Sequence, residues 1–227
     1  MIVIEALAGI AEMGGPVVML LIAMSLVGVA LVLAKIWHFM RAGVGRHGEL
    51  ERALARWDAG DERAAVEAAG AASSHLALLG VTAMQAATQP DADTPALRAR
   101  LTGLAAERLA SLSGGLRVLD SIAQIAPLLG LFGTVLGMIE AFQGLQAAGS
   151  AVDPSALAGG IWVALLTTAV GLAVAMPASL LMTWFDGRIA REALMAEKVI
   201  NTVLCAGVGA PPCALRAARM PSGVAHA

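Results

Sequence analysis

Three long stretches of the chain contain no charged residue, and each is bounded by charged residues. They run from Met13 to Ala34, from Ser121 to Ile139 and from Pro154 to Phe185. A helix of about 20 apolar residues spans the roughly 30 Å hydrocarbon core of a bilayer. The pattern therefore predicts an all-α integral membrane protein whose three transmembrane helices cover residues 13–39, 118–146 and 158–186.

The chain before the second span is more polar. Residues 1–12 are predicted to form a short interfacial helix that is broken at Gly14-Gly15-Pro16. Pro16 is expected at the start of the first span, because proline is tolerated at the first position of a helix. Residues 40–117 predict a helical region rich in alanine, with helical patterns around Glu49–Trp57 and Glu62–Ala69 and a break at Gln89-Pro90.

Both later spans are predicted to extend beyond the bilayer. Leucines recur at helical spacing after Thr94-Pro95, which has the pattern of an N-cap and a first-turn proline, so we expect that helix to run directly into the second span. Helical character also continues after the third span to Asn201. The rest of residues 187–227, with Pro211-Pro212, is predicted to be disordered.

The basic residues predict the orientation. Ten of the 15 Lys and Arg lie between Lys35 and Arg117, and five follow the third span, whereas residues 1–12 and the loop 147–157 have none. Loops rich in Lys and Arg face the cytoplasm, which predicts a periplasmic N-terminus and a cytoplasmic C-terminus. No basic residue precedes Lys35, so we expect the first span to be retained and not cleaved as a signal peptide.

Composition argues against a soluble protein and against an enzyme. Hydrophobic residues make up 58% of the chain and charged residues 14%, whereas soluble domains are about 45–50% apolar. The four histidines are scattered without metal-ligand spacing, and Cys205 and Cys213 form no C-x-x-C pair. We expect no catalytic residues, metal, cofactor or nucleic-acid partner, and membrane lipid as the surroundings.

Small residues at helical spacing distinguish the second and third spans. Such residues allow helix backbones to pack closely in a membrane, or they line a central cavity. Threonine hydroxyls in these spans either bond to their own helix or act in function, and the two prolines are candidate kinks. The residues are Ala126, Pro127, Gly130, Gly133, Thr134, Gly137, Ala164, Thr168, Gly171, Ala175 and Pro177.

Glu140 is the acidic residue that ends the second charge-free stretch. A carboxylate within a membrane helix is a candidate for an ion pathway. Glu140 is expected near the outer end of the span, however, where water among the lipid headgroups solvates it. The interface role is therefore the favoured one.

Two motifs give the chain a resemblance to a known family. The segment 125–139, IAPLLGLFGTVLGMI, resembles the second-span signature of the ExbB/TolQ/MotA family, and the segment 164–178, ALLTTAVGLAVAMPA, resembles its third-span signature. Three spans and a short N-terminus are similar to the ExbB and TolQ branches, and Gly14-Gly15-Pro16 favours ExbB. A non-conducting membrane scaffold is the rival from another class.

The resemblance implies a proton-driven motor in the bacterial inner membrane. In such a motor a ring of subunits, generally five, surrounds the helices of an ExbD- or TolR-like single-span partner and passes work to a TonB- or TolA-like transducer. Thr134 and Thr168 match the threonines that face the partner's proton-binding aspartate. Val163 stands where many members have glutamate or glutamine, which removes an ionisable group from the pathway, and Glu140 is a candidate substitute.

Overall fold

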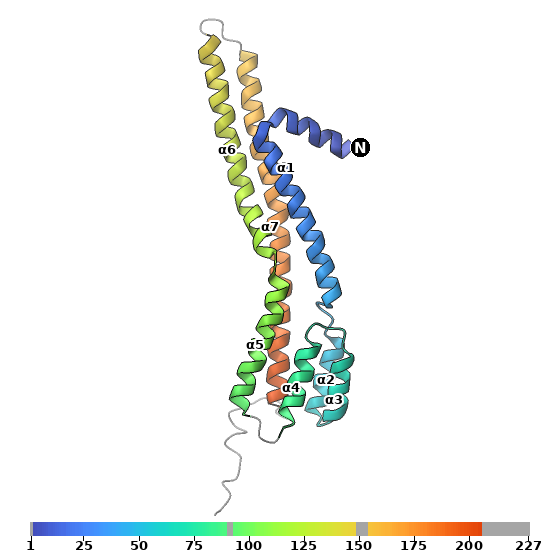
Figure 1. Cartoon of the computed structure of the whole chain (residues 1–227). Coiled ribbons are helices and arrows are strands. Elements are labelled where there is room, and N and C mark those ends of the chain that lie inside the picture. Colours follow the sequence, from blue (N-terminus) through green and yellow to red (C-terminus); the bar gives the residue numbers. More distant parts are fainter. Residues whose placement is uncertain (1, 90–92, 149–153, 206–227) are drawn as a thin grey trace, which may run out of the picture. The chain divides into compact units, whose positions relative to one another are not determined.

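The computed structural model describes residues 2–89, 93–148 and 154–205, which form helices joined by turns and contain no strand (Figure 1). The helices are α1 (Ile2–Ala42), α2 (Gly48–Asp58), α3 (Glu62–Ala71), α4 (Ala77–Ala87), α5 (Thr94–Ser113), α6 (Leu116–Ala148) and α7 (Pro154–Leu204). Three helical segments are long and apolar enough to cross a membrane: Gly15–Ala42, Leu116–Gln146 and Leu157–Leu204. The predicted all-α membrane fold is confirmed.

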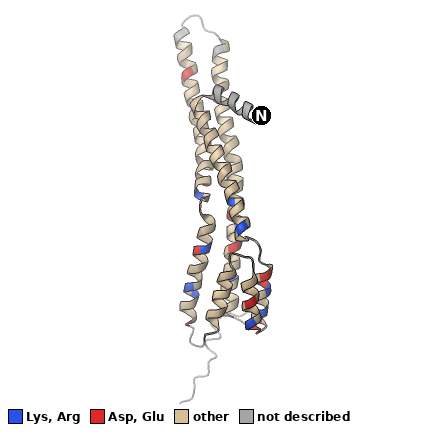
Figure 2. Cartoon of the chain, turned by 45° about the vertical axis from the view of Figure 1, so that its right-hand side comes forward, with Lys and Arg blue, Asp and Glu red and all other residues tan. Residues whose placement is uncertain are grey.

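The chain divides into two compact units. The first, here called the apolar unit, comprises Met1–Trp37 and Gly114–Asp186, and the second, the polar unit, comprises His38–Ser113 and Gly187–Ala227. Figure 2 shows acidic and basic residues on α2, α3, α5 and the end of α7, whereas the segments of the apolar unit carry few charges. The extension of α7 as one helix to Leu204 is as predicted.

In the apolar unit, α1 consists of two helical segments joined at Gly15. Gly15 has φ 63° and ψ −165°, a backbone conformation that favours glycine, and Pro16 opens the second segment. The expected break at this position is confirmed. After it, Leu21 is buried with Ala126 of α6 and Ala175 of α7, so α1 packs against both other spans.

The outer surfaces of these spans are apolar as well. Leu26, Leu128 and Leu180 are each more than 60% exposed, as is Trp162. Soluble monomers seldom expose apolar patches of such extent. Lipid or further protein chains therefore have to cover this surface.

The expectation that the leucine-rich helix runs directly into the second span is wrong. Gly115 has φ 80°, which ends α5 at Ser113 and starts α6 at Leu116. The ammonium group of Lys35 donates a 2.6 Å hydrogen bond to the Gly114 carbonyl, an acceptor that the interrupted helix leaves without its normal partner.

The polar unit has its own hydrophobic core. Leu50 and Trp57 of α2 are buried with Val199 and Val203 of α7, and side chains of α3, α4 and α5 complete the cluster. Both predicted helical patterns in this region form helices, and Asp61 caps α3 by accepting a hydrogen bond from the Ala64 N–H. Helix α4 was not predicted. The C-terminal tail with Cys213, predicted to be disordered, lies outside the described residues.

Candidate functional site: the contact between α6 and α7

The backbones of α6 and α7 touch in the middle of the apolar unit. A Cβ atom added to Gly171 would lie 2.6 Å from the Ala126 carbonyl oxygen, and one added to Gly130 would lie 3.1 Å from the Thr168 Cα atom. Real Cβ atoms essentially never approach as closely as the first distance. Glycine at these positions is therefore what allows the two helices to lie side by side (Figure 1).

The contact continues along α6 towards the loop that joins the two helices. A Cβ on Gly133 would lie 2.7 Å from the Thr167 hydroxyl oxygen, and one on Gly137 would lie 2.9 Å from the Ala164 Cβ. These glycines therefore have a direct packing role. Lining a cavity for a partner helix remains a prediction for this set.

Two neighbouring threonines of α7 bind one carbonyl group of α6. The hydroxyl of Thr168 donates to the Gly130 carbonyl oxygen at 3.1 Å, and the hydroxyl of Thr167 lies 3.2 Å from the same oxygen and 2.7 Å from the Ala164 carbonyl. Thr167 is 3% exposed. The structure thus makes the α6–α7 contact polar at its closest point, in otherwise apolar surroundings.

Thr134, the other predicted pathway residue, lies one helical turn after Gly130. Its hydroxyl donates to the Leu131 carbonyl oxygen at 2.6 Å within α6, and the side chain is half-buried. Bonding within its own helix is one of the two expected roles, and it leaves the hydroxyl oxygen able to accept a further hydrogen bond.

The remaining predicted residues lie outside this contact or at its edge. Glu140 is exposed on α6, and Val163 is half-buried on α7 beside the buried Ala164. Both α6 and α7 continue as helices through Pro127 and Pro177. The pathway roles of Thr134, Thr168 and Glu140 stay predictions.

Sequence reasoning missed two features. The first is Thr167, for which its position next to Thr168 was the available signal. The second is a cluster of His47, His75 and the buried Glu192 in the polar unit, in which both histidines lie within 3.6 Å of one carboxylate. No sequence motif marks this cluster, because its residues come from distant parts of the chain.

Together the fold and the site define a helical membrane protein whose second and third spans join through glycines and threonines. Residues 64–198 match the model of the MotA/TolQ/ExbB proton channel family. The chain belongs to this family, as the resemblance of the two motifs had indicated.

Relatives from two branches of the family are similar to this chain. Biopolymer transport protein exbB1 of Vibrio cholerae is 48% identical over 83 residues, which cover 35% of this chain and 36% of that protein. Biopolymer transport protein ExbB of Pseudomonas putida is 41% identical over 91 residues, or 40% of this chain and 27% of that protein. Tol-Pal system protein TolQ of Haemophilus influenzae is 39% identical over 92 residues, or 39% of this chain and 40% of that protein. The matched segments thus span between 27% and 40% of these relatives' lengths.

Proposed function

We propose that this chain is an ExbB-like subunit of a proton-driven motor in the bacterial inner membrane. With an ExbD-like single-span partner it uses the proton motive force to energise outer-membrane transport through a TonB-like transducer. The observation that carries the proposal is the polar contact at Gly130, where the Thr168 hydroxyl lies in the closely packed interface of two apolar helices. Membership of a proton channel family supports it.

A hydroxyl at this point suits a carboxyl group that gains and loses a proton. The hydroxyl can accept a hydrogen bond from the protonated acid, and it can donate one to the carboxylate after leaving the Gly130 carbonyl. Polar partners of this kind are scarce in hydrocarbon, where an unpaired polar group costs several kcal/mol. Thr168 and Thr134 would therefore stabilise the partner's aspartate in both protonation states.

The proposed assembly places copies of the chain around the partner helices, in a ring of five by family resemblance. The exposed apolar surfaces of α1, α6 and α7 provide the area for lipid and for neighbouring subunits. In the proposed orientation the N-terminus is periplasmic and the polar unit is cytoplasmic, since the polar unit holds most of the basic residues.

A TolQ-like role in the Tol-Pal envelope system is the second candidate, supported by the similarity to TolQ of Haemophilus influenzae. A non-conducting scaffold is the rival from another class, since glycine packing by itself is sufficient for assembly. These three functions predict different phenotypes.

Complementation distinguishes them. The chain is expressed with its single-span partner in cells that lack both their own ExbB and their own TolQ. Restored uptake of siderophore-bound iron, lost again when the proton gradient is collapsed, is the result expected for the ExbB-like role. Restored envelope integrity without iron uptake would indicate the TolQ-like role, and a stable assembly that restores neither would indicate a scaffold.

Thr168→Val tests the proton pathway within this system. Valine has nearly the shape of threonine but no hydroxyl, so the ring should still assemble. Uptake should fall at least about tenfold, because one hydrogen bond to a charged group contributes about 1.5–3 kcal/mol. Uptake is measured together with the mass of the purified assembly. Thr183→Val is the matched control, because Thr183 is exposed and its hydroxyl donates to Ser179 within α7. Full uptake by Thr168→Val would contradict the pathway role.

A further inference from the structure

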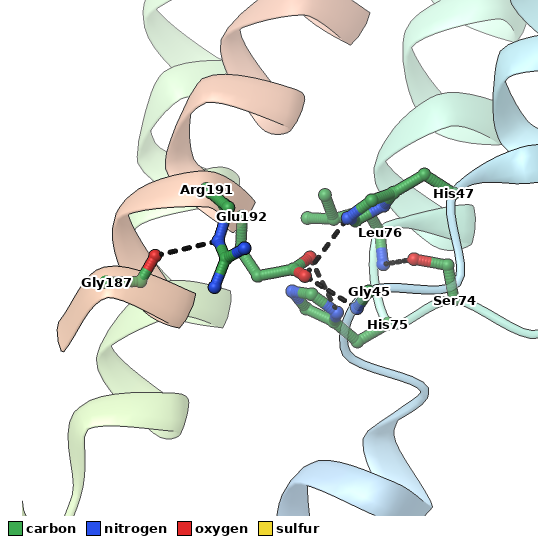
Figure 3. Close-up of polar contacts among 8 residues, drawn as sticks. All are labelled: Gly45, His47, Ser74, His75, Leu76, Gly187, Arg191 and Glu192. Carbon is green, nitrogen blue, oxygen red and sulfur yellow. Dashed lines mark hydrogen bonds and ion pairs between the residues drawn. The ribbon is translucent and has the colours of Figure 1, made fainter. Parts of the chain in front are cut away.

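The polar unit buries a carboxylate between two histidines (Figure 3). Glu192 of α7 is 1% exposed, and its Oε1 accepts a 2.7 Å hydrogen bond from the Gly45 N–H. The same oxygen lies 3.1 Å from His47 Nε2, and the other oxygen, Oε2, lies 3.6 Å from His75 Nδ1. Figure 3 shows the three side chains converging: His47 comes from the turn after α1, His75 from the segment before α4, and Glu192 from α7 itself.

One half of this cluster is paired and the other half is not. Oε1 of Glu192 has two close nitrogen partners, whereas Oε2 and both ring nitrogens of His75 are buried without a hydrogen bond among the described residues. A buried polar group without a hydrogen bond destabilises the state that buries it. The closed arrangement is therefore destabilised by the buried polar atoms of His75, and exposure of His75 to water would remove this destabilisation.

The cluster lies where two chain segments cross. The backbone N–H of His75 donates a hydrogen bond to the Ala42 carbonyl oxygen at 3.0 Å. A Cβ on Gly43 would overlap the Ser73 carbonyl. Glu49 accepts a hydrogen bond from the Ser73 N–H at 3.3 Å. The turn at residues 43–47 and the segment 73–75 are thus held to each other, and through Glu192 to α7.

His75 is held uncharged in this arrangement. Burial, together with the nearby charges of His47 and Arg108, lowers the pKa of His75 from 6.5 to about 4. A histidine whose pKa is lower in the closed state than in water takes up a proton more readily when the structure opens. The closed form is therefore favoured fully above pH 6.5 and loses that advantage as the pH falls towards 4.

The charged groups around His75 come from several elements. They are His47 at the start of α2, Arg108 on α5, and Glu192 on α7, with Arg188 of α7 next to Gly45. Glu192 is the acidic member of this set, and it is already engaged by Gly45 and His47 at Oε1. A proton on His75 would thus meet two neighbouring basic groups, His47 and Arg108, and a carboxylate at 3.6 Å.

We propose that His47, His75 and Glu192 form an acid-sensitive latch, in which proton uptake by His75 releases the turn at residues 43–47 and the segment 73–75 from α7. Other contacts, including the Trp57 N–H to the Val203 carbonyl and the hydrophobic core, hold the rest of the polar unit in place. The opening is therefore local. This role of the latch rests on the proposed function: it would make the motor respond to a fall in cytoplasmic pH. The cytoplasm is the compartment into which a proton-driven motor carries protons.

Hydrogen exchange measured by mass spectrometry on the full chain in lipid nanodiscs tests the latch. Exchange at pH 7.5 and 5.5 is divided by the intrinsic rate of an unstructured peptide at each pH. The pKa of His75 is about 4 in the closed form and about 6.5 in the open form, so the equilibrium constant for opening should be about tenfold larger at pH 5.5 than at pH 7.5. The loss of protection should be confined to peptides that contain residues 43–47 and 73–75.

Two histidine variants give the matched comparison. His75→Gln cannot titrate, so its protection should change less than about twofold over the same interval. His38→Gln, at an exposed histidine, should retain the wild-type response. Unchanged wild-type protection, or the full tenfold response in His75→Gln, would overturn the proposal. The measurement needs neither partner nor proton flow, so failure of the iron-uptake experiment would leave it intact.

Discussion

The smallest residues decide the closest contact in this protein. Gly130 and Gly171 have no side chain between the α6 and α7 backbones, which allows Thr167 and Thr168 of α7 to reach the Gly130 carbonyl oxygen. In a bilayer, close packing and hydrogen bonds of this kind drive helix association, because helix and lipid are equally apolar. The packing role of the glycines and the polar role of the threonines are thus aspects of one contact.

Gly171→Ala tests this contact. The added Cβ would lie 2.6 Å from the Ala126 carbonyl oxygen, so the helices must separate, and we expect the free energy of unfolding to fall by about 1–3 kcal/mol. Chemical unfolding of the purified chain in detergent measures the change.

Gly159→Ala is the control for that substitution. Gly159 also lies on α7, but a Cβ there would meet nothing within 4 Å. Since alanine favours a helix by up to about 1 kcal/mol over glycine, this variant should be as stable as the parent or more so. Equal effects of the two substitutions would contradict the close contact at Gly171.

At the scale of elements, α7 serves both units. Its first part packs against α1 and α6 through Ala175, and its last part contributes Val199 and Val203 to the core of the polar unit. The helical patterns at Glu49–Trp57 and Glu62–Ala69 predicted α2 and α3 correctly. Helix α4 has no strong amphipathic pattern that separates it from the Ala-rich segments around it, and it was missed for that reason.

Trp57→Phe tests how α2 is attached to the end of α7. Trp57 is 5% exposed and its Nε1–H donates to the Val203 carbonyl oxygen at 3.2 Å. Phenylalanine keeps most of the apolar contact but leaves this buried acceptor without its donor, so the polar unit should lose about 1–3 kcal/mol of stability. Hydrogen exchange of peptides from α2 and α3 reports the loss.

Trp37→Phe provides the comparison, because Trp37 is 66% exposed and lies in the apolar unit. It should leave exchange in α2 and α3 unchanged. If both tryptophan variants behave alike, the hydrogen bond to Val203 does not hold α2 in place.

At the scale of the whole molecule, the distribution of charge predicts how the chain lies in the membrane. Basic residues are concentrated in the polar unit, and the loop between α6 and α7 has none. Moving many charged groups across hydrocarbon is costly, so the polar unit is expected to stay on the cytoplasmic side.

Cysteine labelling tests this orientation. In a chain with Cys205→Ser and Cys213→Ser, a membrane-impermeant thiol reagent should label Gln146→Cys when added to cells whose outer membrane alone is permeable. Arg63→Cys should react only after the inner membrane is opened. Both positions are exposed in the structure, so a lack of reaction reflects the membrane and not burial. The opposite labelling pattern would reverse the proposed topology.

The sequence by itself determined the number of candidate spans, the break before Pro16 and the family, because length, hydropathy and spacing of small residues are local properties. It also indicated which glycines pack. The tertiary structure decided the partners: Thr168 and Thr167 bind Gly130 across 38 and 37 positions, and Glu192 meets Gly45 across 147. No local pattern encodes such pairs, since folding alone brings distant segments together. For the same reason the cluster of His47, His75 and Glu192 became visible only in the structure.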